Sequence, residues 1–198
     1  MLVPPSPDFA RLLATISQAL RTRGISFMVI GGHAVLLHGQ ARLTEDIDIT
    51  LDVGPDAFAQ LRDVCAELSL VPLPEDAEGF VRETFVLPAR DAASGVRVDF
   101  IFSTLPYEHQ AIGRAESVEI HGVPVRFATA EDLIIHKLFA GRPRDREDAA
   151  GVVRRKGSHL DWVYLQTWVD EFACLPGREG LSADLAALRS PTAHPSDA

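Results

Sequence analysis

The chain has 198 residues, is 46% apolar and carries a net charge of −9, a composition typical of a globular protein with an adequate core. Its acidity argues against the broad basic surface of a nucleic-acid-binding domain, although it does not exclude a local basic groove. The two cysteines, Cys65 and Cys174, show neither metal-binding nor disulfide spacing. Because the sequence has no signal peptide and no apolar run of roughly 20 residues, we expect a soluble cytoplasmic protein without a membrane span.

Apolar residues at helical spacing alternate with β-rich runs bounded by glycines in the first two thirds of the chain. We expect first a helix over 6–24, with Ser6 as its N-cap and Pro7 at its first position, then a buried strand over 25–32 and a short helix over 33–39. A strand containing Asp46 and Asp48 and a helix over 54–70 should follow. The last predicted elements of this part are strands over 79–89 and 95–102, a helix over 106–115 and a hairpin over 117–129 that turns at His121-Gly122.

The remaining part of the chain has helical patterns. Helices are expected over residues 129–141, 145–155, 160–173 and 181–190. The predicted fold class is therefore α/β (α+β), a mixed β-sheet flanked by helices and followed by a mostly helical part. The predicted domains are a core with an N-terminal helix over 1–128, a helical region over 129–190 and a disordered tail over 191–198.

Two acids, Asp46 and Asp48, stand one residue apart within the apolar string "DIDITL". The pleat of a strand has a period of two, so both carboxylates must point to the same face. Such a pair is stable on a solvated face, the usual case for an isolated D-x-D, or around a hard divalent cation such as Mg²⁺. Asp99, within the β-rich string "VRVDFIF", offers a third carboxylate for a two-metal site.

A pair of glycines, Gly31 and Gly32, lies between a predicted strand and a predicted helix. Glycine lets the backbone approach a phosphate closely, and a helix N-terminus presents unbonded N–H groups to an anion. Glycines also end strands for purely steric reasons, so this signal is weak alone. It becomes strong because D-x-D follows after thirteen residues.

The combination resembles the nucleotidyltransferase superfamily that includes DNA polymerase β, whose members carry an apolar residue and Gly-Gly or Gly-Ser, a spacer, and then D-h-[DE]-h, where h is apolar. The string "GGHAVLLHGQARLTEDIDI" and the later string "AEDLIIHKLFAGRPRDREDAAGVV" are similar to the branch of abortive-infection nucleotidyltransferase toxins of the AbiEii type. The resemblance covers roughly residues 25–155, with the motifs in the same order.

The resemblance implies specific roles for eleven residues. The nucleotide-binding residues would be Gly31, Gly32, Arg42, Thr44, Lys137 and Arg142. The ligands of two Mg²⁺ or Mn²⁺ ions would be Asp46, Asp48 and Asp99. The catalytic residues would be these three aspartates and Lys137, with Asp99 also acting as the base, while Asp145 and Asp148 belong to the distal motif with Arg142. His33 departs from the pattern, because many members place a phosphate-binding Ser near this position.

Several of these residues also have an ordinary structural explanation. Lys137 could be a surface lysine of an amphipathic helix, Arg42 a loop cation that balances Glu45, and the cluster "RPRDRED" an ion-paired helix start. Glu45 and Asp52 are expected to lie outside the site. The seven histidines have no ligand spacing, so we expect no zinc site.

We therefore predict a Mg²⁺-dependent nucleotidyltransferase that transfers a nucleoside monophosphate from a nucleoside triphosphate, such as ATP, to an acceptor hydroxyl. The acceptor would be a tRNA end, a protein or a small molecule, and the resemblance implies a possible toxin with a cognate antitoxin. The alternatives are a catalytically silent nucleotide- or protein-binding module on the same fold, and a two-metal nuclease or phosphoesterase.

Overall fold

A computed structural model describes residues 7–40 and 42–189 of the chain. The predicted cap Ser6 and the predicted tail over 191–198 lie outside these residues. By backbone contacts the chain divides into two compact units. The first takes in the described residues of Met1–Leu37 and Ala41–Thr129, and the second those of His38–Gln40 and Ala130–Ala198.

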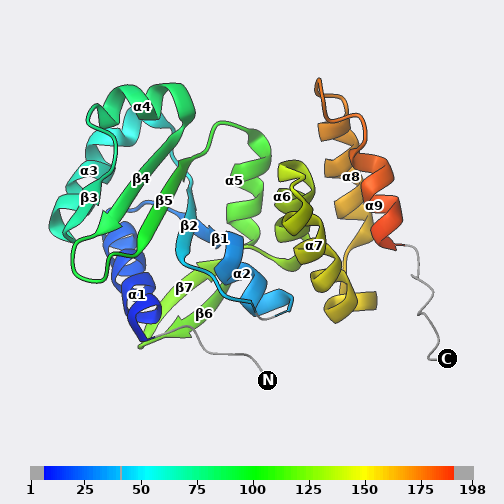
Figure 1. Cartoon of the computed structure of the whole chain (residues 1–198), viewed down its shortest axis with the longest axis horizontal. Coiled ribbons are helices and arrows are strands. Elements are labelled where there is room, and N and C mark those ends of the chain that lie inside the picture. The colour runs from blue at the N-terminus through cyan, green and yellow to red at the C-terminus, as the bar shows by residue number, and fades with distance from the viewer. Residues whose placement is uncertain (1–6, 41, 190–198) are drawn as a thin grey trace. The chain divides into compact units, whose positions relative to one another are not determined.

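The first unit is built on a seven-stranded mixed sheet (Figure 1). Its strands are β1 (Phe27–Ile30), β2 (Asp46–Leu51), β3 (Leu70–Pro72), β4 (Val86–Asp91), β5 (Arg97–Phe102), β6 (Glu116–Ile120) and β7 (Val123–Phe127). They are ordered β3-β4-β5-β2-β1-β7-β6. The pairs β2–β5 and β1–β7 are parallel and the other neighbours antiparallel, so strands distant in sequence meet at the centre.

Helices flank this sheet. They are α1 (Pro7–Thr22), α2 (Gly31–His38), α3 (Phe58–Glu67, after a 3₁₀ turn at Pro55–Ala57), α4 (Ala77–Thr84) and α5 (Pro106–Arg114). Helix α1 packs on β6 and β7, α3 on β3, α4 on β4 and α5 on β2. The predicted fold class is confirmed, because a mixed sheet is flanked by helices and followed by a helical part.

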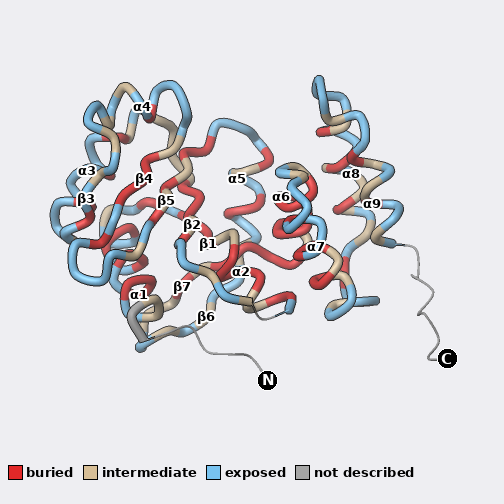
Figure 2. The backbone as a smooth tube through the Cα atoms, in the orientation of Figure 1, coloured by how far each residue is buried: buried red, intermediate tan, exposed pale blue. Residues whose placement is uncertain are grey.

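The core of the first unit includes the face of the sheet to which Ile47 and Ile49 of β2 point. Ile47, Ile49 and Leu51 of β2 and Phe100 of β5 are fully buried, and much of β1 and β2 is coloured as buried in Figure 2. The residues that alternate with Ile47 and Ile49 on β2, namely Asp46 and Asp48, are exposed and half-buried. The period-two pattern therefore places the two acids away from the core, as the sequence predicts.

One predicted element is wrong. Residues 79–84 were expected at the start of a strand, but they form the end of helix α4, and the strand β4 begins only at Val86. The helix has local support that the β-rich composition conceals. The Asp76 carboxylate accepts the backbone N–H of Gly79 at 2.9 Å as an N-cap, and Arg82 pairs with Glu78 one turn earlier. The helix ends at Phe85 in a left-handed conformation.

Two further differences are smaller. The helix expected over 54–70 ends at Glu67, and β3 follows at Leu70–Pro72 as an edge strand that the sequence did not predict. The predicted hairpin is confirmed, since β6 and β7 pair antiparallel around His121 and Gly122. Both residues have positive φ angles of 51° and 75°, which a tight two-residue turn requires.

The second unit consists of helices. They are α6 (Ala130–Ala140), α7 (Pro143–Lys156), a 3₁₀ turn (Gly157–His159), α8 (Trp162–Ala173) and α9 (Leu181–Arg189). Helix α6 packs against α7, α8 and α9, and its residues Leu133, Ile134 and Leu138 are buried. Within the described ranges, none of the helices of either unit is both long and apolar enough to cross a bilayer.

Candidate active site

The three predicted metal ligands come from neighbouring strands in one register. Because β2 and β5 run parallel, Asp48 lies directly opposite Asp99, and Asp46 lies opposite Arg97. Adjacent strands are about 4.8 Å apart, and residues two apart on a strand share a face. The four side chains therefore form a block on one face of the sheet, with three carboxylates and one guanidinium. The structure thus brings Asp46, Asp48 and Asp99 together.

The predicted phosphate-binding glycines lie at the start of helix α2, next to this block. Gly31 has a φ angle of +62°, and a Cβ atom there would stand 1.9 Å from Oδ2 of Asp48. A Cβ atom on Gly32 would stand 2.1 Å from Oγ1 of Thr44. No side chain fits at either position without displacing Asp48 or Thr44. The first N–H groups of a helix have no partner within it, so this turn presents donors beside the carboxylates.

Arg97 is the residue of this block that the sequence reasoning missed. Its Nε atom donates to both oxygens of Asp99, at 2.9 and 3.2 Å. The hydrogen bond with Asp99 and the negative charges of Asp99, Asp46 and Asp48 raise the pKa of Arg97, against a smaller opposing effect of burial. The signal was present in the sequence, because Arg97 stands two residues before Asp99 and must share its face.

The donor set fits a hard divalent cation. Three carboxylates in one register supply the oxygen ligands that Mg²⁺ prefers, and their mutual repulsion needs a positive charge. Among the residues that the structure describes, no three acidic, histidine or cysteine side chains are already gathered as metal ligands. In this structure both oxygens of Asp99 accept hydrogen bonds from Arg97.

Thr44 and Arg42 lie on the loop between α2 and β2. The Thr44 hydroxyl donates to the backbone oxygen of Asp46 at 3.4 Å, and Nη1 of Arg42 donates to the backbone oxygen of Leu43 at 3.1 Å. His33 in the first turn of α2 packs against the Phe9 ring, with centroids 5.0 Å apart. Burial, helped by the charge of Arg42, lowers the pKa of His33 to about 4, so this imidazole is neutral at neutral pH.

Lys137 and the distal motif belong to the second unit and form a buried ion cluster there. Nζ of Lys137 lies 2.9 Å from Oδ1 of Asp145 and 2.9 Å from Oδ2 of Asp148. Nε of the largely exposed Arg142 lies 2.5 Å from the second oxygen of Asp145. Burial raises the pKa of Asp145, but hydrogen bonds from Arg142 and Lys137 outweigh it and hold this pKa below its usual range. Lys137 is therefore a buried lysine and not a surface residue.

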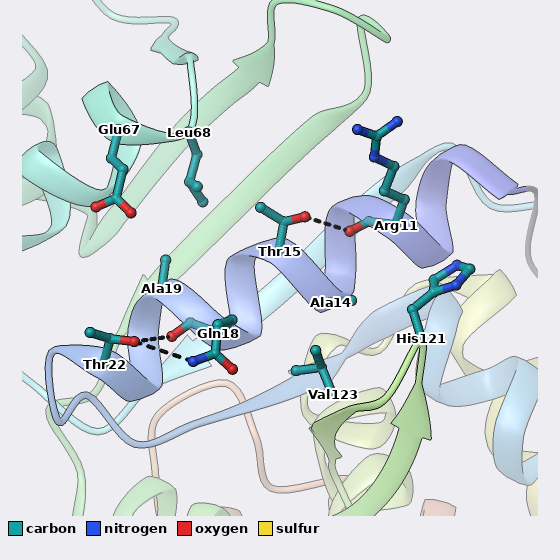
Figure 3. Close-up of a pocket in the computed structure, with 10 residues that line it drawn as sticks. All are labelled: Arg11, Ala14, Thr15, Gln18, Ala19, Thr22, Glu67, Leu68, His121 and Val123. Atoms are coloured by element: carbon teal, nitrogen blue, oxygen red, sulfur yellow. Dashed lines mark hydrogen bonds between the residues drawn. The ribbon is translucent and has the colours of Figure 1, made fainter.

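The two acids expected to lie outside the site have other surroundings. Glu45 is exposed and precedes β2, and Asp52 follows the far end of β2, where it pairs with Nδ1 of His109. A groove of about 660 Å³ runs along α1 and the hairpin, lined among others by Arg11, Leu68 and His121 (Figure 3). It contains none of the predicted site residues, so its position does not mark the carboxylate block.

Comparison with known families agrees with this geometry. Residues 8–175 match the model of a family described as "Nucleotidyltransferase of unknown function (DUF6036)". The chain belongs to this family. The match takes in both the carboxylate block and the ion cluster of Lys137. It confirms that this chain is a nucleotidyltransferase of the predicted superfamily.

Solved structures share the fold of this nucleotidyltransferase at low identity. The solution structure of the antibiotic-resistance factor ANT(2″)-Ia matches with a TM-score of 0.60 and 16% identity, over 85% of this chain and 95% of that one. ANT(2″)-Ia in complex with adenylyl-2″-tobramycin has a TM-score of 0.53 and 17% identity, over 92% and 97%. An antigenic nucleotidyltransferase-like protein from Paracoccidioides brasiliensis matches with a TM-score of 0.56 and 17% identity, over 92% of this chain and 94% of that one. No curated protein matches the chain in sequence.

Proposed function

We propose that this nucleotidyltransferase is Mg²⁺-dependent and transfers a nucleoside monophosphate from a nucleoside triphosphate to an acceptor hydroxyl. The observation that carries the proposal is the register of β2 and β5, which sets Asp48 opposite Asp99 with Asp46 one pleat away. The start of α2 adjoins this block so closely that Gly31 has no space for a Cβ atom. Metal ligands and phosphate-binding N–H groups are thus adjacent.

In the proposed reaction, the acceptor oxygen bonds to the α-phosphorus, the bond from that phosphorus to the bridging oxygen breaks, and pyrophosphate leaves. Asp99 takes the proton of the acceptor hydroxyl. Asp46, Asp48 and Asp99 would hold two Mg²⁺ ions, which supply charge stabilisation for the triphosphate and acidify the acceptor hydroxyl. Backbone N–H groups at Gly31 and Gly32 orient the phosphates, with Thr44 at the side of the same turn.

ATP is the nucleotide that we propose. The adenylyl group in the ANT(2″)-Ia complex supports this choice, since that protein shares the fold over most of both chains. Lys137 and Arg142 are proposed to contribute to nucleotide binding through the family motif in which they lie. Their side chains already have carboxylate partners in the second unit, so any contact with phosphate would be made by cations held in a fixed geometry.

A small molecule or a protein hydroxyl is the acceptor that the charges favour. The chain carries −9 overall, and arginines of α7 that could form a basic groove have partners within the second unit. Arg146 pairs with Asp184 at 3.0 Å, and Arg155 donates to the backbone oxygen of Gly39. Arg154, Arg155 and Lys156 also stand in the last turn of α7, where cations are favoured by the helix dipole. A tRNA acceptor and a toxin role with a cognate antitoxin remain proposals that follow from the resemblance alone. A cytoplasmic location remains a proposal that follows from the amino-acid sequence.

The test is to incubate the protein with Mg²⁺ and each of the four labelled nucleoside triphosphates, together with tRNA, cell proteins or small hydroxyl compounds in separate reactions. We expect label from ATP on one acceptor class, and loss of labelling in Asp48→Asn. Asp52→Asn is the matched control, because it neutralises an acid next to the same strand but outside the block. No labelling with any triphosphate would instead support a silent module, and degradation of nucleic acid without triphosphate would support a nuclease.

A further inference from the structure

Arg97 belongs to the same block of side chains as the three proposed metal ligands. It shares a sheet face with Asp99, lies opposite Asp46, and donates to both oxygens of Asp99. The side chain of Asp99 is 18% exposed, whereas that of Arg97 is 44% exposed. The carboxylate is thus held in place while the guanidinium lies half in solvent.

The contact of Arg97 conflicts with the proposed role of Asp99. A guanidinium and a divalent cation compete for carboxylate lone pairs, and both Asp99 oxygens already accept a hydrogen bond from Nε of Arg97. A metal ion bound by Asp99 must therefore displace the hydrogen bond from Arg97 or share the carboxylate with it. Arg97 cannot leave the face, because its backbone is fixed within β5, but its half-exposed end is able to turn. A guanidinium released from a carboxylate is well suited to bind phosphate oxygens in pairs.

We propose that Arg97 is a positioning residue that holds Asp99 and offsets the charge of the three carboxylates before the metal and nucleotide bind, and that it then passes from Asp99 to a phosphate of the bound triphosphate. The proposal rests on the proposed function of the same site. It makes metal and nucleotide binding cooperative: the metal competes with Arg97 for Asp99, and the triphosphate gives Arg97 another partner. The free enzyme therefore binds metal weakly and the nucleotide complex binds it tightly.

The test measures Mn²⁺ affinity by the electron paramagnetic resonance signal of the free ion, first without nucleotide and then with a non-hydrolysable ATP analogue. Without nucleotide, Arg97→Gln should raise Mn²⁺ affinity about tenfold, because a competing charge beside the ligands is removed. Arg97→Lys keeps the charge but loses the planar fork, so its Mn²⁺ affinity should lie between those of the wild type and Arg97→Gln. With the analogue, Arg97→Gln should gain less Mn²⁺ affinity than the wild type gains, and should bind the analogue at least about fivefold more weakly.

Arg90→Gln is the matched control. Arg90 lies opposite Arg97 on β4, is exposed, and donates to the backbone oxygen of Gly95 at 2.7 Å. The Arg90→Gln substitution should change Mn²⁺ affinity by less than about twofold. Circular dichroism melting curves would verify that each variant is folded. If Arg97→Gln does not fold, Arg97→Lys is the variant to compare with the wild type.

The outcomes separate the two proposals. Equal or weaker Mn²⁺ binding by Arg97→Gln without nucleotide would overturn the role of Arg97, and so would an equal gain in Arg90→Gln, which would reveal only a long-range effect of net charge. If the wild type binds no Mn²⁺, or Asp48→Asn binds it equally well, the proposed metal site itself is wrong and the inference fails with it.

Discussion

Replacing Lys137 by Met tests whether the ion cluster of the second unit is structural. The Lys137 side chain is 8% exposed, and those of Asp145 and Asp148 are 2% and 6% exposed. Methionine occupies a similar volume, so the change removes a charge and leaves little cavity. Both buried carboxylates would then lose the Lys137 ammonium group, and Asp145 would keep its contact with the outer cation Arg142.

The expected loss is large because two buried carboxylates would each lose the ammonium group of Lys137. Removing one member of a buried ion pair costs about 3–5 kcal/mol, which is a substantial part of the about 5–15 kcal/mol that stabilises a typical domain. For a protein of this size, the loss corresponds to a fall in Tm of about 6–20 °C. Arg146→Ala, which breaks the exposed pair with Asp184, should cost no more than about 1 kcal/mol.

The assay is urea denaturation followed by tryptophan fluorescence. Both tryptophans of the chain, Trp162 and Trp168, lie in α8, so the signal reports the second unit. Adding Asp145→Asn and Asp148→Asn to Lys137→Met should restore more than half of the lost free energy of unfolding, because the uncompensated charges are then gone. A loss below about 1 kcal/mol in Lys137→Met would refute the reasoning. So would the absence of any recovery in the triple variant.

The pH dependence of this cluster has a definite sign. The folded-state pKa of Asp145 is lowered, chiefly by hydrogen bonds from Arg142 and Lys137 that outweigh its burial. The contribution of Asp145 to stability is therefore present above its unfolded pKa of about 3.9 and is lost as the pH falls through its lower folded value.

Loss of activity in Lys137→Met is informative about nucleotide binding only at temperatures where the variant remains folded.

Two further predictions concern glycine and histidine. Gly24→Ala should lose about 1–2 kcal/mol because its φ is positive, and Gly31→Ala should lose at least as much because its Cβ would also displace Asp48. Only Gly31→Ala should lose labelling activity, since a Cβ at Gly24 meets nothing within 4 Å, and equal activity in the two variants would contradict the proposed site. The pKa values of His33 and His136 are lowered to about 4, mainly by burial, so the unfolded state binds more protons and stability should fall between pH 6.5 and 4 by up to about 3 kcal/mol for each. His136→Gln should flatten this decline in urea titrations at several pH values, and an unchanged slope would show that the folded-state pKa of His136 is not lowered.

Several features could be predicted because they depend on neighbours in the chain. The alternation of Asp46 and Asp48 with isoleucines determines which face of β2 is polar whatever the sheet around it. The turn at His121-Gly122 likewise follows from local backbone preferences. The strand expected over 79–89 failed where local signals conflicted, since β-branched and aromatic residues there were outweighed by the Asp76 cap and the packing of Val81.

The surroundings of Lys137 show a second limit. From its helix alone, this residue is indistinguishable from a surface lysine with an apolar stem. Its burial depends on Asp145 and Asp148, which reach it only because α7 packs against α6. The motif was visible in the sequence, but the ion pairs depend on the packing of two helices.

The sequence by itself determined the local pieces of the candidate site: which strand carries two acids, which turn needs glycine, and to which superfamily the order of these motifs belongs. Only the tertiary structure decided that Asp99 lies opposite Asp48 and that Arg97 holds it. The physical reason is that β2 and β5 pair across a long intervening segment, and the register of such a pair is set by burial of the whole sheet and not by either strand alone.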